Sequence, residues 1–200
     1  MALSNAPFGL RPVRTLTGAS WNAQLMKVQF PTGDSADRFL GDPVVLLGSS
    51  DAGGNYPTVG IASGGSGNPI LGIVVAFEVD PTNLELKYRV ASTARYAYIV
   101  VDPMVVFQVM VNGTLTVGDV GANAVLSAAA TGSTVTGFSG WSLYYTTTPA
   151  ANAAYQLNIL GVSNIPNNPI GQYCVVDVLI NTNTQRAVYS NSAWAGSLGV

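Results

Sequence analysis

Apolar residues recur along the chain in short runs, many of which alternate with polar residues, and turn residues separate one run from the next. This period of two is typical of β-strands, in which successive side chains point to opposite faces of a sheet. The runs fall at 24–30, 43–47, 70–79, 84–90, 96–101, 104–111, 155–162, 173–180 and, in a shorter form, 186–189. Many short strands between turn signals predict an all-β fold, either a single barrel or a sandwich-like domain.

The run 84–90 alternates without a fault. One face is apolar and the other is ionic, which gives Leu84, Leu86, Tyr88 and Val90 against Glu85, Lys87 and Arg89. This pattern predicts a half-buried strand whose charged face points to solvent.

Other segments predict a hairpin, one helix and a loop. Asn112-Gly113 is a tight-turn signal, which makes 114–117 the second strand of a hairpin with the run before it. Asp119 can cap the alanine-containing segment 119–130, which is the one short helix that we expect. Segment 49–68 is rich in glycine and serine and predicts a loop; its glycines lack the features of a phosphate-binding loop.

The N-terminal segment has the features of a strap that lies on a surface. Pro7 and Pro12 lack the backbone N–H, which excludes a helix and disfavours a central strand. Three apolar and two cationic side chains accompany them: Phe8, Leu10, Val13, Arg11 and Arg14. We therefore expect residues 1–20 to form an extended arm on a β-rich domain of residues 21–200, lying either on that domain or on a partner.

Charged residues are scarce in this chain. They make up 9% of the 200 residues, and the net charge is −2, whereas an average soluble protein has about 25% charged residues. A surface of neutral polar side chains loses little hydration when a partner docks, so the composition favours association through large interfaces. The scattered lysines and arginines predict no nucleic-acid binding. No apolar run approaches the 18 residues of a membrane helix, and the N-terminus has no secretory pattern, so we expect synthesis in the cytoplasm and no membrane partner.

Residue types that carry catalysis are few. The chain has no histidine, which excludes Ser-His-Asp and Cys-His sites, and its one cysteine, Cys174, lies inside an apolar run, where we expect a buried inert thiol. Aromatic side chains could form a sugar-binding face, although burial explains them as well. They are Trp21, Trp141, Tyr144, Tyr145 and Trp194.

Two groups of carboxylates are candidate sites. Asp34, Asp37 and Asp42 could bind a calcium ion, but their spacing does not match an EF-hand loop, and the capping of turns is the favoured explanation. Glu78 and Asp80 share a strand face, as a pair of glycosidase carboxylates would, but solvated acids are common at strand ends. We expect no catalytic residues, no cofactor and no metal.

Several segments together resemble the head decoration, or cement, proteins of tailed bacteriophages. Each is short, but they occur in a shared order over nearly the whole chain. They are Pro7–Arg14, Phe39–Val44, Ile70–Val74 followed by Phe77-Glu78, Asp102–Val109, Gly121–Ala124, Gly132–Gly140, Ile159–Val162 and Val176–Asn181.

The resemblance implies a non-enzymatic virion structural protein, made in the host cytoplasm, that binds the outside of the capsid and stabilises contacts between capsomers of the phage major capsid protein. The symmetry of the shell favours self-association as a trimer, with a dimer as second choice. Partner contacts are then expected from the strap residues Phe8, Leu10, Arg11, Val13 and Arg14. The alternative is a carbohydrate-binding module or adhesin on the virion surface, which would use exposed Trp and Tyr side chains.

Overall fold

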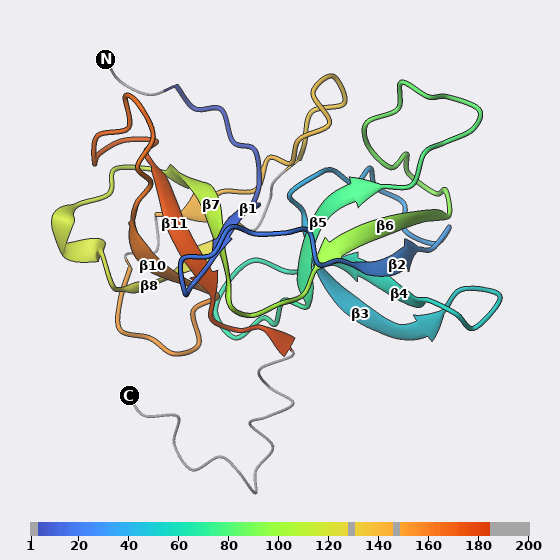
Figure 1. Cartoon of the computed structure of the whole chain (residues 1–200), viewed down its shortest axis with the longest axis horizontal. Helices are drawn as coiled ribbons and strands as arrows, with labels where there is room; N and C mark the ends of the chain where they lie inside the picture. Colours follow the sequence, from blue (N-terminus) through green and yellow to red (C-terminus); the bar gives the residue numbers. More distant parts are fainter. Residues whose placement is uncertain (1–3, 128–130, 146–148, 185–200) are drawn as a thin grey trace, which may run out of the picture.

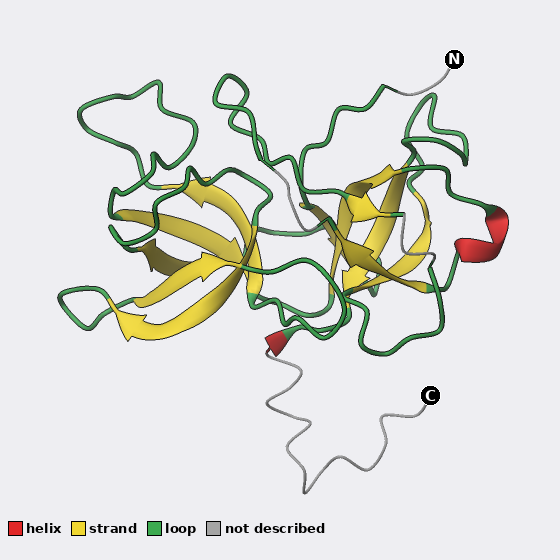
Figure 2. Ribbon diagram, turned by 180° about the vertical axis from the view of Figure 1, so that it is seen from behind, coloured by secondary structure: helices red, strands yellow, loops and turns green. Residues whose placement is uncertain are grey.

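Two β-structures stand side by side in this computed structural model, which describes residues 4–127, 131–145 and 149–184 (Figure 1). Eleven strands occur in these ranges, and long loops join many of them (Figure 2). The predicted all-β fold class is confirmed, and one of the two structures is a closed barrel.

The closed β-structure is called the first barrel below, and the other is called the second sheet. The first barrel closes because β2, the first strand of its strand order, pairs with β6, the last. Around the barrel the strands are β2 (Met26–Phe30), β4 (Pro57–Ile61), β3 (Pro43–Ser50), β5 (Gly72–Phe77) and β6 (Arg95–Val100). The core consists of Val28, Phe30, Val44, Val59, Leu71, Val74, Ala97 and Ile99. Strand β4 lies within 49–68, so the prediction of a loop is wrong for 57–61, where Val59 is buried against the other strands.

The second sheet combines β1, which precedes the first barrel in sequence, with strands that follow it. In strand order it contains β1 (Arg11–Thr15), β7 (Val105–Asn112), β11 (Val175–Ile180), β10 (Leu157–Val162), β8 (Asn123–Leu126) and β9 (Leu143–Tyr144). Strand β9 also pairs with β7. The strands β7, β11, β10, β8 and β9 therefore form a ring of pairings, and β1 lies outside it. Because β1 is an edge strand, it tolerates Pro12, which has no N–H to donate.

The core of the second sheet extends onto two strands of the first barrel. Val74 of β5 belongs to the core of the first barrel, whereas its neighbour Ile73 packs with residues of the second sheet. Val100 of β6 also belongs to the second core. Burial on both faces explains why the first half of the run 70–79, residues 70–74, is continuously apolar.

The predicted helix over 119–130 is wrong. A 3-10 helix covers Val117–Asp119, and the chain then forms strand β8. The carboxylate of Asp119 accepts hydrogen bonds from the backbone N–H and the hydroxyl of Thr116, so it closes a turn behind it and does not start a helix. Gly121 follows with φ of +89°, a left-handed conformation that ends any helix. Residues 128–130 lie outside the described ranges.

The predicted strand over 84–90 is also wrong, and one of its three charged side chains, Arg89, points inwards while Glu85 and Lys87 are exposed. Leu84 is 78% exposed, while Arg89 is fully buried. The Arg89 guanidinium donates to the carbonyls of Pro31, Asp34, Ala36 and Thr93 at 2.7–2.8 Å. A guanidinium has five N–H donors, and these four carbonyl acceptors make its burial possible. The alternating sequence pattern does not show that such acceptors will surround Arg89.

The hairpin expected after Asn112-Gly113 does not form. Thr114 instead bridges Gln172, and the N–H of Leu115 donates to the carbonyl of Gly171 at 3.1 Å. In this pairing Leu115 is buried. A hairpin that returned along β7 would not pair Leu115 with Gly171. The strand expected at 186–189 lies outside the described residues.

Candidate functional site: an apolar groove beside the N-terminal strap

The strap, residues 7–15, lies on the protein's own surface and ends in β1. β1 pairs antiparallel with β7, with Arg11 opposite Gln108. Leu10 is 1% exposed and belongs to the core of the second sheet, and Arg14 forms an ion pair with Asp177 at 3.3 Å. The protein itself therefore supplies the pocket for Leu10 and the carboxylate for Arg14.

The remaining strap residues are less enclosed. Phe8 and Val13 are half-buried, and Arg11 is exposed. Of these, Phe8 and Arg11 line a groove between the strap and the first barrel. The structure thus divides the five predicted contact residues. Leu10 faces inwards, Arg14 pairs within the chain, Val13 is half-buried away from the groove, and Phe8 and Arg11 remain at an open surface.

The strap is held against the barrel where its backbone passes close to Gly41. This close approach of Gly9 to Gly41 is called the glycine crossing below. The N–H of Leu10 donates to the carbonyl of Gly41 at 3.1 Å, and the N–H of Gly41 donates to the carbonyl of Val74 at 2.7 Å. A Cβ atom on Gly9 would lie 2.6 Å from the Gly41 oxygen, and one on Gly41 would lie 2.7 Å from the Phe8 oxygen. Both glycines also have positive φ, so only glycine fits this close approach without strain.

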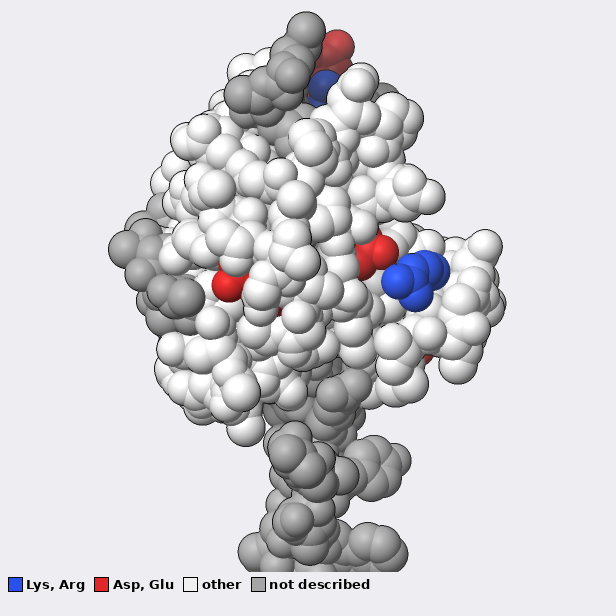
Figure 3. All heavy atoms as spheres, turned by 90° about the vertical axis from the view of Figure 1, so that its left-hand side faces the viewer, with Lys and Arg blue, Asp and Glu red and all other residues white. Residues whose placement is uncertain are grey.

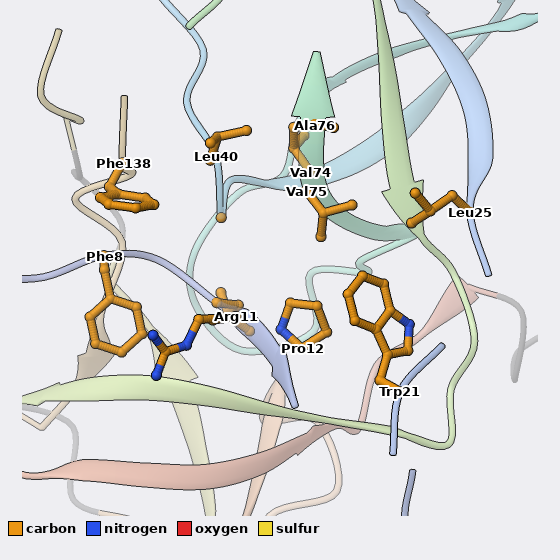
Figure 4. A pocket seen from close by; sticks show the side chains of 12 residues that line it. Phe8, Arg11, Pro12, Trp21, Leu25, Leu40, Val74, Val75, Ala76 and Phe138 are labelled. Atoms are coloured by element: carbon orange, nitrogen blue, oxygen red, sulfur yellow. The ribbon is translucent and has the colours of Figure 1, made fainter. Parts of the chain in front are cut away.

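The groove has a volume of about 590 Å³ and a largely apolar lining. Figure 4 shows two facing rows of side chains. One row comes from the strap and the segment after it, and contains Phe8, Arg11, Pro12 and Trp21; the other contains Phe138, Leu40, Val75 and Leu25. Phe138 is 49% exposed and Leu25 is 38% exposed, so the rim of the groove is itself apolar.

Segments far apart in sequence meet at this groove. The loop before Trp141 contributes Phe138, whose segment pairs with Leu40 through an isolated β-bridge. Sequence reasoning had marked Phe8 and Arg11, but it could not identify Leu25, Val75 or Phe138 as their neighbours. Their proximity follows from the glycine crossing, and the short motifs around Gly9, Gly41 and Phe138 were the only signal in the sequence.

Three aspartates that could have bound a cation have other partners. Asp34 accepts two hydrogen bonds from Arg38 and also pairs with Arg89. Asp37 accepts from the N–H of Ala91, and Asp42 accepts from the N–H of Phe39 at 2.8 Å. No cluster of three metal-binding side chains is found within the ranges that the structure describes.

Burial affects one of these carboxyls strongly. Desolvation raises the pKa of Asp42 to about 6, although hydrogen bonds from Phe39 and Ser139 and the charge of Arg38 act in the opposite direction. Asp42 follows Gly41 directly, so this titrating group stands beside the glycine crossing.

Glu78 and Asp80, the second candidate group of acids, lack the environment of a glycosidase pair. Glu78 forms an ion pair with Lys27 at 2.9 Å. Asp80 accepts hydrogen bonds from the hydroxyl and N–H of Thr82, which lower its pKa. A general acid needs a raised pKa, so this environment disfavours that role for Asp80.

The remaining candidates are mostly internal. Cys174 is buried, and burial raises the pKa of its thiol, as expected for an inert cysteine. Trp141 is 4% exposed and belongs to the core, and the Tyr145 hydroxyl donates to Asp119. Trp194 lies outside the described residues. The aromatic side chains proposed for sugar binding therefore do not form one exposed face in the described structure.

Charged side chains are distributed unevenly between the two β-structures. Residues 105–184 contain no lysine or arginine, and their acidic residues are Asp119 and Asp177. Viewed from the side of the second sheet, the molecule shows a largely uncharged surface (Figure 3).

Comparisons with protein-family models, curated proteins and solved structures found no match to this chain. Within the described residues, no helix has the length and hydrophobicity of a membrane span.

Proposed function

We propose that this chain is a non-enzymatic virion structural protein of a tailed bacteriophage, which binds the outside of the capsid and stabilises contacts between capsomers of the major capsid protein. The observation that supports this proposal best is the exposed apolar groove beside the strap. An apolar surface of this kind is typical of a site of association. Three of the segments that resemble decoration proteins, Pro7–Arg14, Phe39–Val44 and Gly132–Gly140, meet at its base, where Gly9 lies against both Gly41 and Ser139.

The neutral surface of the second sheet is a further argument for association. Desolvating an ion is unfavourable, so an interface that contains few ions loses little hydration energy when it forms. We expect the free protein to form symmetric trimers, with dimers as second choice, because symmetric copies fit the junctions of an icosahedral shell. Light scattering coupled to size-exclusion chromatography measures this mass directly.

Co-sedimentation with DNA-free expanded capsids of the phage that encodes the chain tests the proposal. Deletion of the strap is unsuitable, because it removes Leu10 from the core and most of β1 from the sheet. Phe138→Glu is better, since Phe138 is half exposed in the groove. Val117→Glu is the matched control, because Val117 is 77% exposed and does not line the groove.

Wild type and Val117→Glu should bind the shells equally, and Phe138→Glu should bind at least about tenfold more weakly, as for a residue in the centre of an interface. Absence of shell binding by the wild type contradicts the proposed function. Equal binding by Phe138→Glu removes the groove from it.

A further inference from the structure

The groove is elongated and has distinct ends. The two rows of side chains run side by side, with Phe8 opposite Phe138 at one end and Trp21 beside Leu25 at the other (Figure 4). Its volume of about 590 Å³ is within the usual range of binding sites, roughly 300–1,000 Å³. A linear apolar segment matches this shape better than a single compact group.

Arg11 provides the charge at the Phe8 end. Its guanidinium carbon lies 5.3 Å from the centre of the Phe8 ring, and one of its nitrogens donates to the neutral side chain of Gln108. In the described part of the chain Arg11 takes part in no ion pair, whereas Arg14, three residues later, is paired with Asp177. Arg11 therefore retains donors for a carboxylate, which a guanidinium binds through two parallel hydrogen bonds.

We propose that the groove binds a linear segment of a partner protein whose apolar side chains lie between the two rows and whose carboxylate, from Asp or Glu, pairs with Arg11. The inference rests on the proposed function and specifies the chemistry of the capsid segment that the groove accepts. Charge complementarity selects this occupant, since an apolar segment without an acid would leave Arg11 unpaired at the rim of an apolar surface.

Two fluorescent probes of nearly equal shape test the recognition itself. Anilinonaphthalene sulfonate carries an anion on an apolar ring system, and N-phenyl-1-naphthylamine is the neutral equivalent. Wild type should bind the anionic probe more tightly. Arg11→Gln should weaken the anionic probe about five- to tenfold, the effect of one lost charge-assisted hydrogen-bond pair, and leave the neutral probe unchanged.

Three variants serve as controls in the same titrations. Arg11→Lys keeps the charge and should retain most of the preference for the anion. Arg14→Gln should leave both affinities unchanged, because Arg14 pairs within the chain. Phe138→Ala should weaken both probes, because Phe138 belongs to the apolar wall. Equal anion binding by Arg11→Gln, or no effect of Phe138→Ala on either probe, would overturn the inference.

Competition with shells connects the groove to the partner. Expanded capsids should displace the anionic probe from the wild type, and an excess of the neutral probe should weaken shell binding. Shells that bind without displacing the probe contradict the inference but leave the proposed function in place. Shells that do not bind at all contradict the proposed function, while the probe titrations still decide whether the groove selects apolar anions.

Discussion

The first barrel and the second sheet stabilise their buried polar groups by different chemistry. Around the first barrel, arginines make the long-range contacts: Arg89 binds four carbonyls, and Arg95 donates to the carbonyls of Glu78 and Tyr88. In the second sheet, whose ion pair among the described residues is Arg14–Asp177, neutral amides take most of this role. Asn168 makes three bonds of 2.8 Å to backbone groups of Ser163 and Val175.

Gln156 shows how far an amide can replace an ion. It is fully buried in the second sheet, and its amide nitrogen donates to the carbonyls of Ser63 and Asn68. Its oxygen accepts from the N–H groups of Gly65 and Leu126. One neutral side chain therefore ties the glycine-rich loop after β4 to the second sheet. Because amides form such links without charge, the second sheet can have a nearly uncharged surface and still satisfy its loops.

Removal of Arg89 from the first barrel should cause the largest loss of stability. Arg89→Ala removes the guanidinium that donates to four carbonyls and one of the two arginines that pair with Asp34. The loss of one partner from such a buried network typically destabilises by about 3–5 kcal/mol. Lys87→Ala, two residues away at an exposed side chain, should change stability by less than about 0.5 kcal/mol. Urea unfolding of both variants checks this. If they were equally stable, the ionic network would have no stabilising role.

A pH series should then show the titration of Asp42. Its pKa is raised to about 6 in the folded protein from 3.8, so the native state holds a proton that the unfolded chain has lost. Stability from this group is present at pH 4 and decreases as the pH rises through 6. The difference amounts to about 3 kcal/mol, at 1.36 kcal/mol per pKa unit.

Asp42→Asn, which stays neutral, isolates that contribution. Relative to this variant, the free energy of unfolding of the wild type should fall between pH 4 and pH 7. The charges of Arg38 and Asp34 that act on Asp42 are present in both proteins, so the difference between the two profiles reports the Asp42 carboxyl. Parallel pH profiles for the two proteins would show that Asp42 does not titrate in this range.

The smallest of the three losses of stability is expected for Gln156, at the second sheet. Gln156→Leu removes four hydrogen bonds and leaves the buried N–H of Leu126 without its acceptor, which should destabilise by about 2 kcal/mol. Because no charge is involved, the loss should be the same in 0.05 and about 1 M salt. Gln172→Leu, at an exposed position of the same half, is the control. A loss that depended on salt would contradict the contrast between the two halves.

Hydrophobic periodicity identified the strands that pack as sheets usually do. The runs at 24–30, 96–101 and 173–180 became β2, β6 and β11 because their alternating faces separate core from surface. The run 84–90 has the better pattern but lacks a neighbouring strand, and Arg89 turns inwards to acceptors from distant loops. A periodic pattern does not contain that information.

The groove was accessible to sequence reasoning only in part. The prolines and the mixture of apolar and cationic residues at the N-terminus indicated an extended strap, and residues 11–15 of it form the edge strand β1. Which strap residues stay available depends on a partner 163 positions away, since Asp177 takes Arg14. The facing wall depends on the close approach of Gly9 to Gly41, which requires the folded barrel.

The pairing of β1 with β7 also sets an order of events during synthesis. Arg11 leaves the ribosome 97 residues before its partner Gln108. At the usual rate of about 5–20 residues per second, the strap waits roughly 5–20 s before the strand that receives it exists. The first barrel, whose strands end at Val100, is complete by then. The backbone groups of β1 therefore have no β7 strand to pair with throughout that interval.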